Sequence, residues 1–237
     1  MGHARTIAAN LPRVLLTLAA AAALTGCPRP VRPPPAAPPV APTQAAIPAD
    51  ARQFDIVPGE SVVHILVYRA GTLAKAGHNH VVTSRDLEGV VYLTPQIERS
   101  QFRIVLPVAR FVIDDAEARR EAGPEFAADV PQTAREGTRR NMLSPAVLAA
   151  DDFPEITLIS SRIEAAPGGA LATVEVRVRD RTSTLTFPIR YEQKANELLA
   201  DGELAVRQTD LGLTPFTALL GAIWRSEERR VGKECRS

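Results

Sequence analysis

The sequence has few of the residues that cross-link a chain or fill a large aromatic core. Only two of its 237 residues are cysteines, Cys27 and Cys235, and they stand near opposite ends of the chain. Aromatic residues make up 5% of the composition, so an apolar pocket would be lined mainly by Val, Ile and Leu. The formal net charge is only +1, which argues against a nucleic-acid-binding domain, because such domains usually carry a large basic excess.

Motifs of common enzyme classes are also missing from the sequence. It contains no Gly-x-Ser-x-Gly elbow, no P-loop and no Gly-x-Gly-x-x-Gly fingerprint. The adjacent carboxylates Asp114-Asp115 and Asp151-Asp152 cannot share one side of a helix, so we interpret them as helix caps rather than catalytic pairs. The pairs Arg119-Arg120 and Arg139-Arg140 are interpreted as solvated helix faces. We therefore expect a non-enzymatic protein without a cofactor.

The N-terminal region has the pattern of a bacterial lipoprotein signal peptide over residues 1–26. Arg5 and Arg13 precede an apolar run of eleven residues, Val14–Leu24, which is too short for a membrane-spanning helix of about 20 residues. The run ends in Leu24-Thr25-Gly26-Cys27, which resembles a lipobox. Cys27 is therefore the expected lipid anchor, bearing palmitate-type acyl chains on a protein that faces the periplasm. The alternative is an ordinary secretory signal with a chance cysteine.

Residues 27–49 form a proline-rich linker, in which Pro28–Pro48 contains nine prolines. Proline lacks the backbone N–H donor, so this segment cannot join a helix or a sheet ladder. An extended polyproline II spacer of ~3.1 Å per residue is expected, and it would hold a folded domain away from a membrane surface.

The last residues, Arg225–Ser237, read RSEERRVGKECRS. Most of this string can be encoded by a common short-read sequencing adapter, so we interpret residues 225–237 as an adapter-derived artefact. The alternative is a genuine, solvated basic tail. If the artefact interpretation is right, Cys235 has no role and the final strand of the domain is missing.

Residues 50–224 predict one mainly β domain. Period-two alternation between turn residues is the dominant pattern, and it predicts an antiparallel barrel or sandwich. Pro107 should break or bulge one long strand, and Pro167-Gly168-Gly169 and Asp201-Gly202 are expected hairpin turns. The strand candidates are Ser61–Tyr68, Asp86–Leu93, Gln101–Ile113, Ile156–Ile163, Leu171–Arg179, Thr182–Tyr191 and Glu203–Gln208. A helical insertion is expected between them, with helices at Asp115–Ala122, Gln132–Met142 and Pro145–Ala149.

Four segments of this domain together resemble the YceI-like family. Ser61–Gly71 resembles its first strand, Asn141–Ser161 its Phe-Pro loop and following strand, Val174–Ile189 its central hairpin, and Gln208–Leu219 the segment before its last strand. The hairpin turn departs from the family, because Asp180-Arg181-Thr182 stands where Gly-Val-Thr is usual. The resemblance implies an extended antiparallel lipocalin-like β-barrel with a short helical insertion.

The resemblance further implies that the barrel binds a long-chain apolar lipid, of the polyisoprenoid or isoprenoid quinone type. Homodimerisation through the barrel is a further expectation that rests on the resemblance alone. A barrel of about eight strands either fills with side chains or holds one small ligand, so a packed structural lipoprotein is the competing interpretation. The expected ligand contacts are Val63, Ile65, Val67, Ile156, Leu158, Val176, Val178, Leu185, Phe187, Leu213 and Phe216.

Three of the four histidines, His64, His78 and His80, lie within seventeen residues. His-x-His on a strand would place both rings on one face, a spacing that suits zinc or copper, with His64 as a third ligand. The alternatives are a polar rim, in which His78 and His80 contact a ligand head group, and a solvated loop. We expect the rim contact and no metal.

Overall fold

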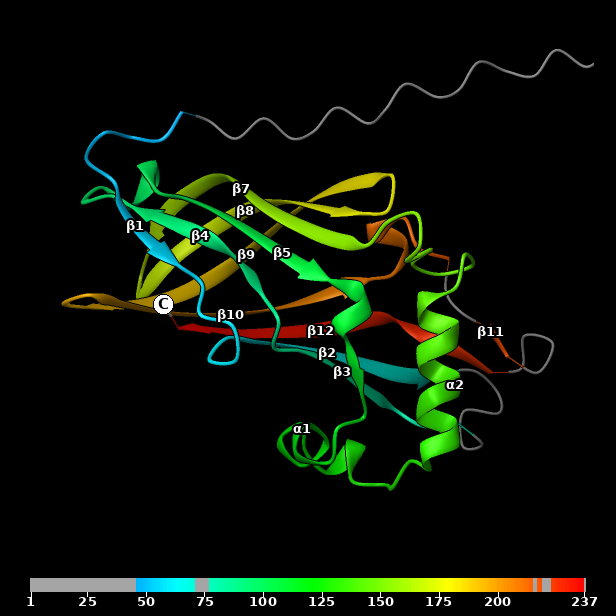
Figure 1. Ribbon diagram of the computed structural model, residues 1–237. Helices are drawn as coiled ribbons and strands as arrows, with labels where there is room; N and C mark the ends of the chain where they lie inside the picture. Colours follow the sequence, from blue (N-terminus) through cyan, green and yellow to red (C-terminus); the bar gives the residue numbers. More distant parts are fainter. Residues whose placement is uncertain (1–45, 71–76, 215–216, 219–222, 237) are drawn as a thin grey trace, which may run out of the picture. The chain divides into compact units, whose positions relative to one another are not determined.

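The computed structural model describes residues 46–70, 77–214, 217–218 and 223–236. Its strands are β1 (Arg52–Asp55), β2 (Val62–Ala70), β3 (His80–Ser84), β4 (Glu88–Leu93), β5 (Gln101–Pro107), β6 (Val112–Ile113), β7 (Glu155–Ala166), β8 (Gly169–Val178), β9 (Arg181–Lys194), β10 (Glu197–Arg207), β11 (Thr217–Ala218) and β12 (Ile223–Arg236). The helices are α1 (Ala116–Glu121) and α2 (Gln132–Leu143), with 3₁₀ turns η2 (Ile97–Arg99), η3 (Val108–Arg110), η4 (Pro124–Phe126) and η5 (Thr209–Leu211). The predicted mainly β fold with a helical insertion is confirmed (Figure 1).

The strands form where apolar and polar residues alternate, because successive side chains of a strand point to opposite faces. In β8, Val174, Val176 and Val178 are buried, whereas Glu175 and Arg177 between them are partly exposed. The neighbouring β9 repeats this alternation, with Leu185 and its alternate neighbours less exposed than the threonines between them. One face of the sheet thus supplies the apolar interior.

The sheet closes on itself because three of its long strands are bent. Each bent strand consists of two consecutive segments, namely β1–β2, β3–β4 and β5–β6. The pairing order runs from β5 through β7, β8, β9, β10 and β12 to β2 and β3. Only three residues separate β3 from β4, and β4 pairs with β5, so the bent strand β3–β4 joins the two ends of this order. β6 continues β5 and pairs with β3. On the other side of the bent strand β3–β4, β1 pairs with β4 and β2 pairs with β3. This connection forms an antiparallel ring around one core, as the resemblance predicted.

The position of the final strand is occupied, which differs from the expectation that it would be missing. β12 pairs with β10 on one side and with β2 on the other. Backbone N–H and C=O groups form the ladder whatever the side chain, and the segment contains no proline that would remove a donor. Its sequence nevertheless lacks apolar alternation, since Arg229 and Lys233 pair with the core residues Val67 and Val63. The adapter origin of residues 225–237 stays a prediction.

The helical insertion lies beside β2 and β3 (Figure 1). α1 begins after Asp115, whose carboxylate accepts hydrogen bonds from the backbone N–H groups of Glu117 and Ala118, so its predicted capping role is confirmed. The expected helix Pro145–Ala149 is wrong, because this stretch forms turns. Within the described residues, no helix is both long and apolar enough to span a membrane.

Two expectations about strand ends had opposite outcomes. Pro107 ends β5 and η3 follows it, which confirms the break, because proline has no N–H for the ladder. The expected Asp201-Gly202 turn is wrong, because both residues pair within β10 against Arg190 and Ile189 of β9. Glycine suits this position because a Cβ would lie 3.1 Å from the carbonyl oxygen of Pro188. The β9–β10 chain reversal instead contains Ala195, at a φ of 36°.

Candidate ligand-binding site

Two apolar cavities lie inside the ring of strands. The helix-end cavity is closed on one side by α2 and is lined by Ile65, Val67, Val82, Phe111, Thr138, Asn141, Met142, Val147, Leu148, Ile156, Val178, Val206, Gln208, Leu211 and Leu213. The far cavity is lined by Val91, Leu93, Ile97, Ser100, Phe102, Ile104, Leu158, Ile163, Phe187, Ile189, Tyr191, Leu198, Ala200, Asp201 and Gly202. The interior of the barrel is therefore not completely packed.

The size of each cavity suits part of a chain-like ligand. Each offers about 90 Å³ of positions for the centre of a water molecule, and one water needs only ~10–15 Å³ on this measure. Ile156 of the helix-end cavity and Leu158 of the far cavity are two residues apart on β7, which corresponds to ~7 Å along a strand. The two cavities therefore follow each other along the barrel.

A cluster of charged residues, which we call the Asp114 cluster, lies where α1 meets β3. The carboxylate of Asp114 contacts His80 Nδ1 at 2.5 Å, accepts a hydrogen bond from the Arg119 guanidinium at 2.6 Å and accepts another from the Val81 backbone N–H at 2.9 Å. Arg119 also donates to the carbonyl oxygens of Asn79 and Ala128. The cluster thereby joins β3, the end of β6 and α1.

The electrostatics of Asp114 follow from this geometry. Burial acts to raise the pKa of the carboxyl group. The hydrogen bond and the charge of His80, followed by the bonds from Val81 and Arg119, outweigh that effect and lower the pKa below its ordinary value. Asp114 is thus held as a carboxylate inside the fold, and a buried carboxylate with these partners stabilises the docking of α1.

A family model described as the YceI-like domain matches residues 54–233, well over half of the chain. The chain belongs to the YceI-like family. This assignment agrees with the ring of strands and with the helical insertion between β6 and β7.

The solved structure of a similar protein agrees with the fold of this YceI-like domain. Burkholderia cenocepacia BcnA shares 13% identity with it at a TM-score of 0.57, and the match covers 77% of this chain and 99% of BcnA. The Campylobacter jejuni YceI protein, known from crystals with large solvent channels, shares 10% identity at a TM-score of 0.47, over 65% of this chain and 81% of that one. At 13% identity the likeness to BcnA shows the fold alone. No curated protein matches the chain.

The predicted ligand contacts of the YceI-like domain fall into three groups. Ile65, Val67, Ile156, Val178 and Leu213 line the helix-end cavity, and Leu158 and Phe187 line the far cavity. Val63, Val176 and Leu185 belong to the apolar core without lining either of these two cavities. Phe216 and the expected anchor Cys27 lie outside the residues whose side chains are described. Contact of these side chains with a ligand stays a prediction.

The three histidines of the YceI-like domain do not form one set. His80 pairs with Val67, which lines the helix-end cavity, whereas His64 pairs with Thr83 on the opposite face of β2. The ring centroids of His78 and His80 are 6.4 Å apart. β3 begins at His80, so His78 and His80 do not both belong to one strand. In the described part of the chain no three His, Cys, Asp or Glu side chains are placed to hold a metal ion. The geometry does not favour the alternative of a metal site.

Sequence reasoning missed the contribution of the helical insertion to the cavity wall. Thr138, Asn141 and Met142 of α2 close the helix-end cavity. Their spacing of three and four residues places them on one face of a helix, and this spacing could have indicated the wall. Arg119, interpreted as part of a solvated face, is instead buried against Asp114, because α1 packs on β3. Sequence neighbours alone could not reveal this partner.

Proposed function

We propose that this protein is a lipid-anchored envelope lipoprotein whose barrel binds a long apolar chain, of the polyisoprenoid or isoprenoid quinone type, without catalysing a reaction. The observation that carries the proposal is the pair of cavities in line along the barrel, with walls made mostly of Val, Ile, Leu and Phe. A chain that enters them leaves water, and each Å² of apolar surface removed from water contributes ~25 cal/mol.

The family supports the same conclusion, because the YceI-like family is one of binding proteins with this barrel. Polar side chains are few in the cavity walls: Thr138, Asn141 and Gln208 in the helix-end cavity and Ser100, Tyr191 and Asp201 in the far cavity. A site with a largely aliphatic wall and a few polar groups is typical of ligands that are mostly hydrocarbon.

The ligand can be tested by extraction. The full-length chain is expressed in a bacterium, purified in mild detergent, extracted with organic solvent and analysed by mass spectrometry. The expected result is a long-chain isoprenoid at about one molecule per protein. Recovery of bulk phospholipid alone, or of no lipid in repeated preparations, contradicts the proposal.

A cavity-filling variant sharpens this test. Ala200 lines the far cavity, whereas Ala205 of the same strand is exposed on the other face. Ala200→Phe should therefore weaken the binding of a forty-carbon isoprenoid by about tenfold or more, since lost apolar contact lowers affinity. Ala205→Phe is the matched control and should bind like the unchanged protein. Equal effects of the two substitutions contradict binding inside the barrel.

The proposed anchor and envelope location rest on the sequence around Cys27. Labelling of cells with radioactive palmitate should modify the full-length chain, and Cys27→Ser should abolish the label and release the protein from the membrane fraction. Cys235→Ser is the matched control and should keep both the label and the membrane location.

A homodimer stays an expectation from the family, to be checked by light scattering of the purified protein.

A further inference from the structure

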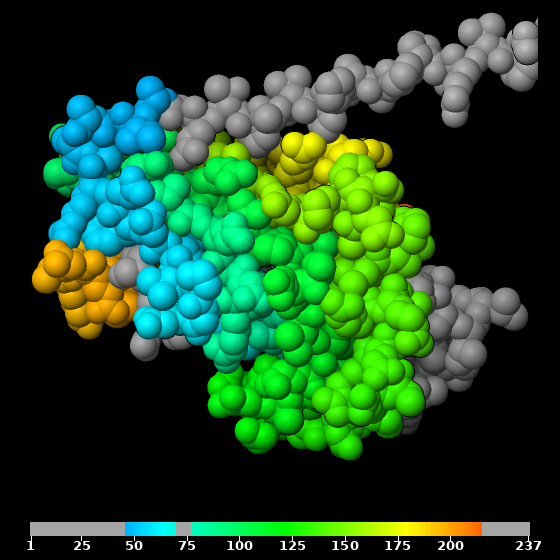
Figure 2. All heavy atoms as spheres, in the orientation of Figure 1, coloured from blue at the N-terminus to red at the C-terminus, as the bar shows by residue number. Residues whose placement is uncertain are grey.

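An open pocket of about 480 Å³ lies between α2, η3 and β6. We call it the arginine pocket, because Arg110, Arg135 and Arg139 line it. Asp86 and Glu136 are the carboxylates in its wall, and Val112, which is 51% exposed, is its large exposed apolar residue. Figure 2 shows the surface on which the residues of β5 and β6 meet those of α2.

The three guanidinium groups of this pocket lack carboxylate partners. Within the described residues, none of them takes part in an ion pair. Arg139 donates to the carbonyl oxygen of Ala109 at 2.6 Å, and Arg135 Nη1 is 3.5 Å from the carbonyl oxygen of Asp114. Arg135 Nε is buried and has no hydrogen-bond partner among the described residues. A buried donor without an acceptor is costly, so the pocket has unused capacity for an acceptor.

The placement of the arginines on α2 indicates the same capacity. Arg135 and Arg139 are four residues apart and therefore adjacent on the helix surface. Two like charges at this spacing destabilise a helix. Of the two carboxylates in the wall, Glu136 already accepts a hydrogen bond from Gln132 at 2.9 Å, and Asp86 is exposed. An anion between the arginines would remove the repulsion.

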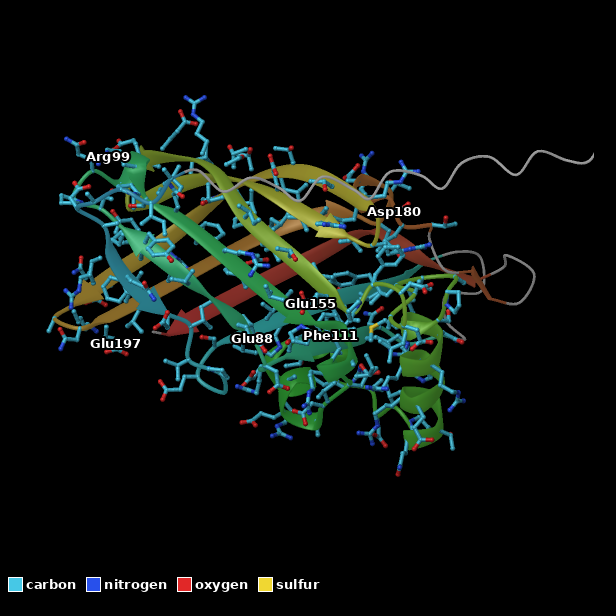
Figure 3. All side chains as sticks on the ribbon, turned by 45° about the horizontal axis from the view of Figure 1, so that its top comes forward. Glu88, Arg99, Phe111, Glu155, Asp180 and Glu197 are labelled. Atoms are coloured by element: carbon cyan, nitrogen blue, oxygen red, sulfur yellow. The ribbon has the colours of Figure 1, made fainter. Side chains whose placement is uncertain are left out.

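The arginine pocket adjoins the lumen of the barrel. Phe111 lines both the pocket and the helix-end cavity, and Figure 3 shows it where β5 ends, between the sheet and the helices. α2 contributes to both spaces, with Thr138 and Met142 in the cavity and Arg135 and Arg139 in the pocket. The buried Phe111 thus forms the wall between the two spaces, and a rotation of its side chain would let a ligand with an anionic head and an apolar chain occupy both.

We propose that the arginine pocket binds a phosphoryl group, namely the phosphate or diphosphate head group of an isoprenoid chain held in the barrel. This inference rests on the proposed function for the apolar part of the ligand, whereas the arginine pocket is observed independently of that function. Planar guanidinium groups donate paired hydrogen bonds that match phosphate oxygens. A neutral alcohol or quinone head offers no charge for three arginines, so the arginine pocket favours the anionic isoprenoids as ligands.

The test compares four probes on the full-length protein by isothermal titration: farnesyl diphosphate, farnesyl phosphate, farnesol and inorganic pyrophosphate. We expect both phosphorylated probes to bind at least about tenfold more tightly than farnesol, because charged hydrogen bonds are stronger than neutral ones. The preference should shrink as salt is raised, since exposed charges are screened. The triple variant Arg110→Gln, Arg135→Gln, Arg139→Gln should lose the preference while its affinity for farnesol is unchanged.

Arg140→Gln is the matched control, because Arg140 is exposed on the same helix and does not line the pocket. It should keep the preference, and thermal melting should show that both variants are folded.

Equal affinity of the unchanged protein for farnesol and farnesyl diphosphate overturns the inference, as does an Arg140→Gln effect equal to that of the triple variant. Arginine-dependent binding of pyrophosphate as tight as that of farnesyl diphosphate supports the phosphoryl site but assigns it to a free anion. Failure of both farnesol and longer polyprenols to bind contradicts the proposed function and leaves the pyrophosphate arm to decide the pocket.

Discussion

Two arginine–aspartate pairs of this domain have almost the same length and opposite surroundings. Arg119 and Asp114 are 2.6 Å apart with side chains that are 8% and 0% exposed, whereas Arg99 and Asp50 are 2.7 Å apart with side chains that are 47% and 46% exposed. The exposed pair has the better fork geometry, because both oxygens of Asp50 accept from the guanidinium of Arg99. The buried pair shares its carboxylate with His80 and Val81.

The comparison shows that burial, rather than distance, decides how much a structure depends on an ion pair. Water screens an exposed pair and replaces either partner when one is removed. A buried partner that loses its counter-charge has no such replacement. We therefore expect the helical end of the barrel to be sensitive to single charge changes and the Arg99–Asp50 region to be tolerant of them.

The largest effect is expected for Asp114→Ala. The substitution leaves Arg119 and His80 buried without their carboxylate, so the free energy of unfolding should fall by about 3–5 kcal/mol. Urea denaturation followed by circular dichroism measures this change. A loss below about 1 kcal/mol, the range of exposed pairs, would contradict the distinction between the two pairs.

Acid should weaken the buried pair selectively. The pKa of Asp114 is lowered in the folded protein, so its carboxylate contributes stability that is fully present above the unfolded pKa of about 4. That stability is lost as the pH falls through the lower folded pKa. The stability difference between the unchanged protein and Asp114→Asn, measured by urea titration from pH 7 to pH 2, should therefore shrink below about pH 4. A difference that stays constant with pH would show that charge is not the cause.

Asp115, the neighbour of Asp114, gives a smaller and mechanistically different effect. It caps α1 at the surface and holds no buried charge, so Asp115→Ala should reduce the free energy of unfolding by about 1 kcal/mol. Asp115→Ser is the control, because a serine hydroxyl also accepts from the helix N–H groups. If Asp115→Ala cost as much as Asp114→Ala, the argument that burial makes the loss of Asp114 the more costly one would be wrong.

The smallest effect is expected at the exposed pair. Arg99→Ala should change the free energy of unfolding by less than about 1 kcal/mol, and 0.5 M NaCl should make the difference smaller still, because salt screens exposed charges. Equilibrium denaturation at low and high salt measures both. A loss of several kcal/mol would show that the pair holds the chain before β1 against η2 more strongly than its exposure indicates.

Most strands could be predicted from the sequence, but few of the neighbouring strands with which they pair could be predicted. Alternation located β8 and β9 and their inward faces, because the period of two is a local property of the chain. β1 and β3 were missed, since β1 is short and β3 is buried throughout and shows no alternation. Asp201-Gly202 was misread as a turn, because a glycine that admits a close neighbouring strand looks the same in sequence as one that reverses the chain.

The candidate site shows the same division between local and long-range properties. The sequence by itself determined that the interior would be aliphatic, that alternate residues of strands such as β8 would face it, and that a helical segment would interrupt the strands. Only the tertiary structure decided that the bent strand β3–β4 joins the ends of the sheet, that His64 and His80 lie on opposite faces, and that Arg119 meets Asp114. Cavities and buried pairs are made by residues far apart in the chain. Their existence therefore depends on how surfaces fit together, and a local pattern carries no information about that fit.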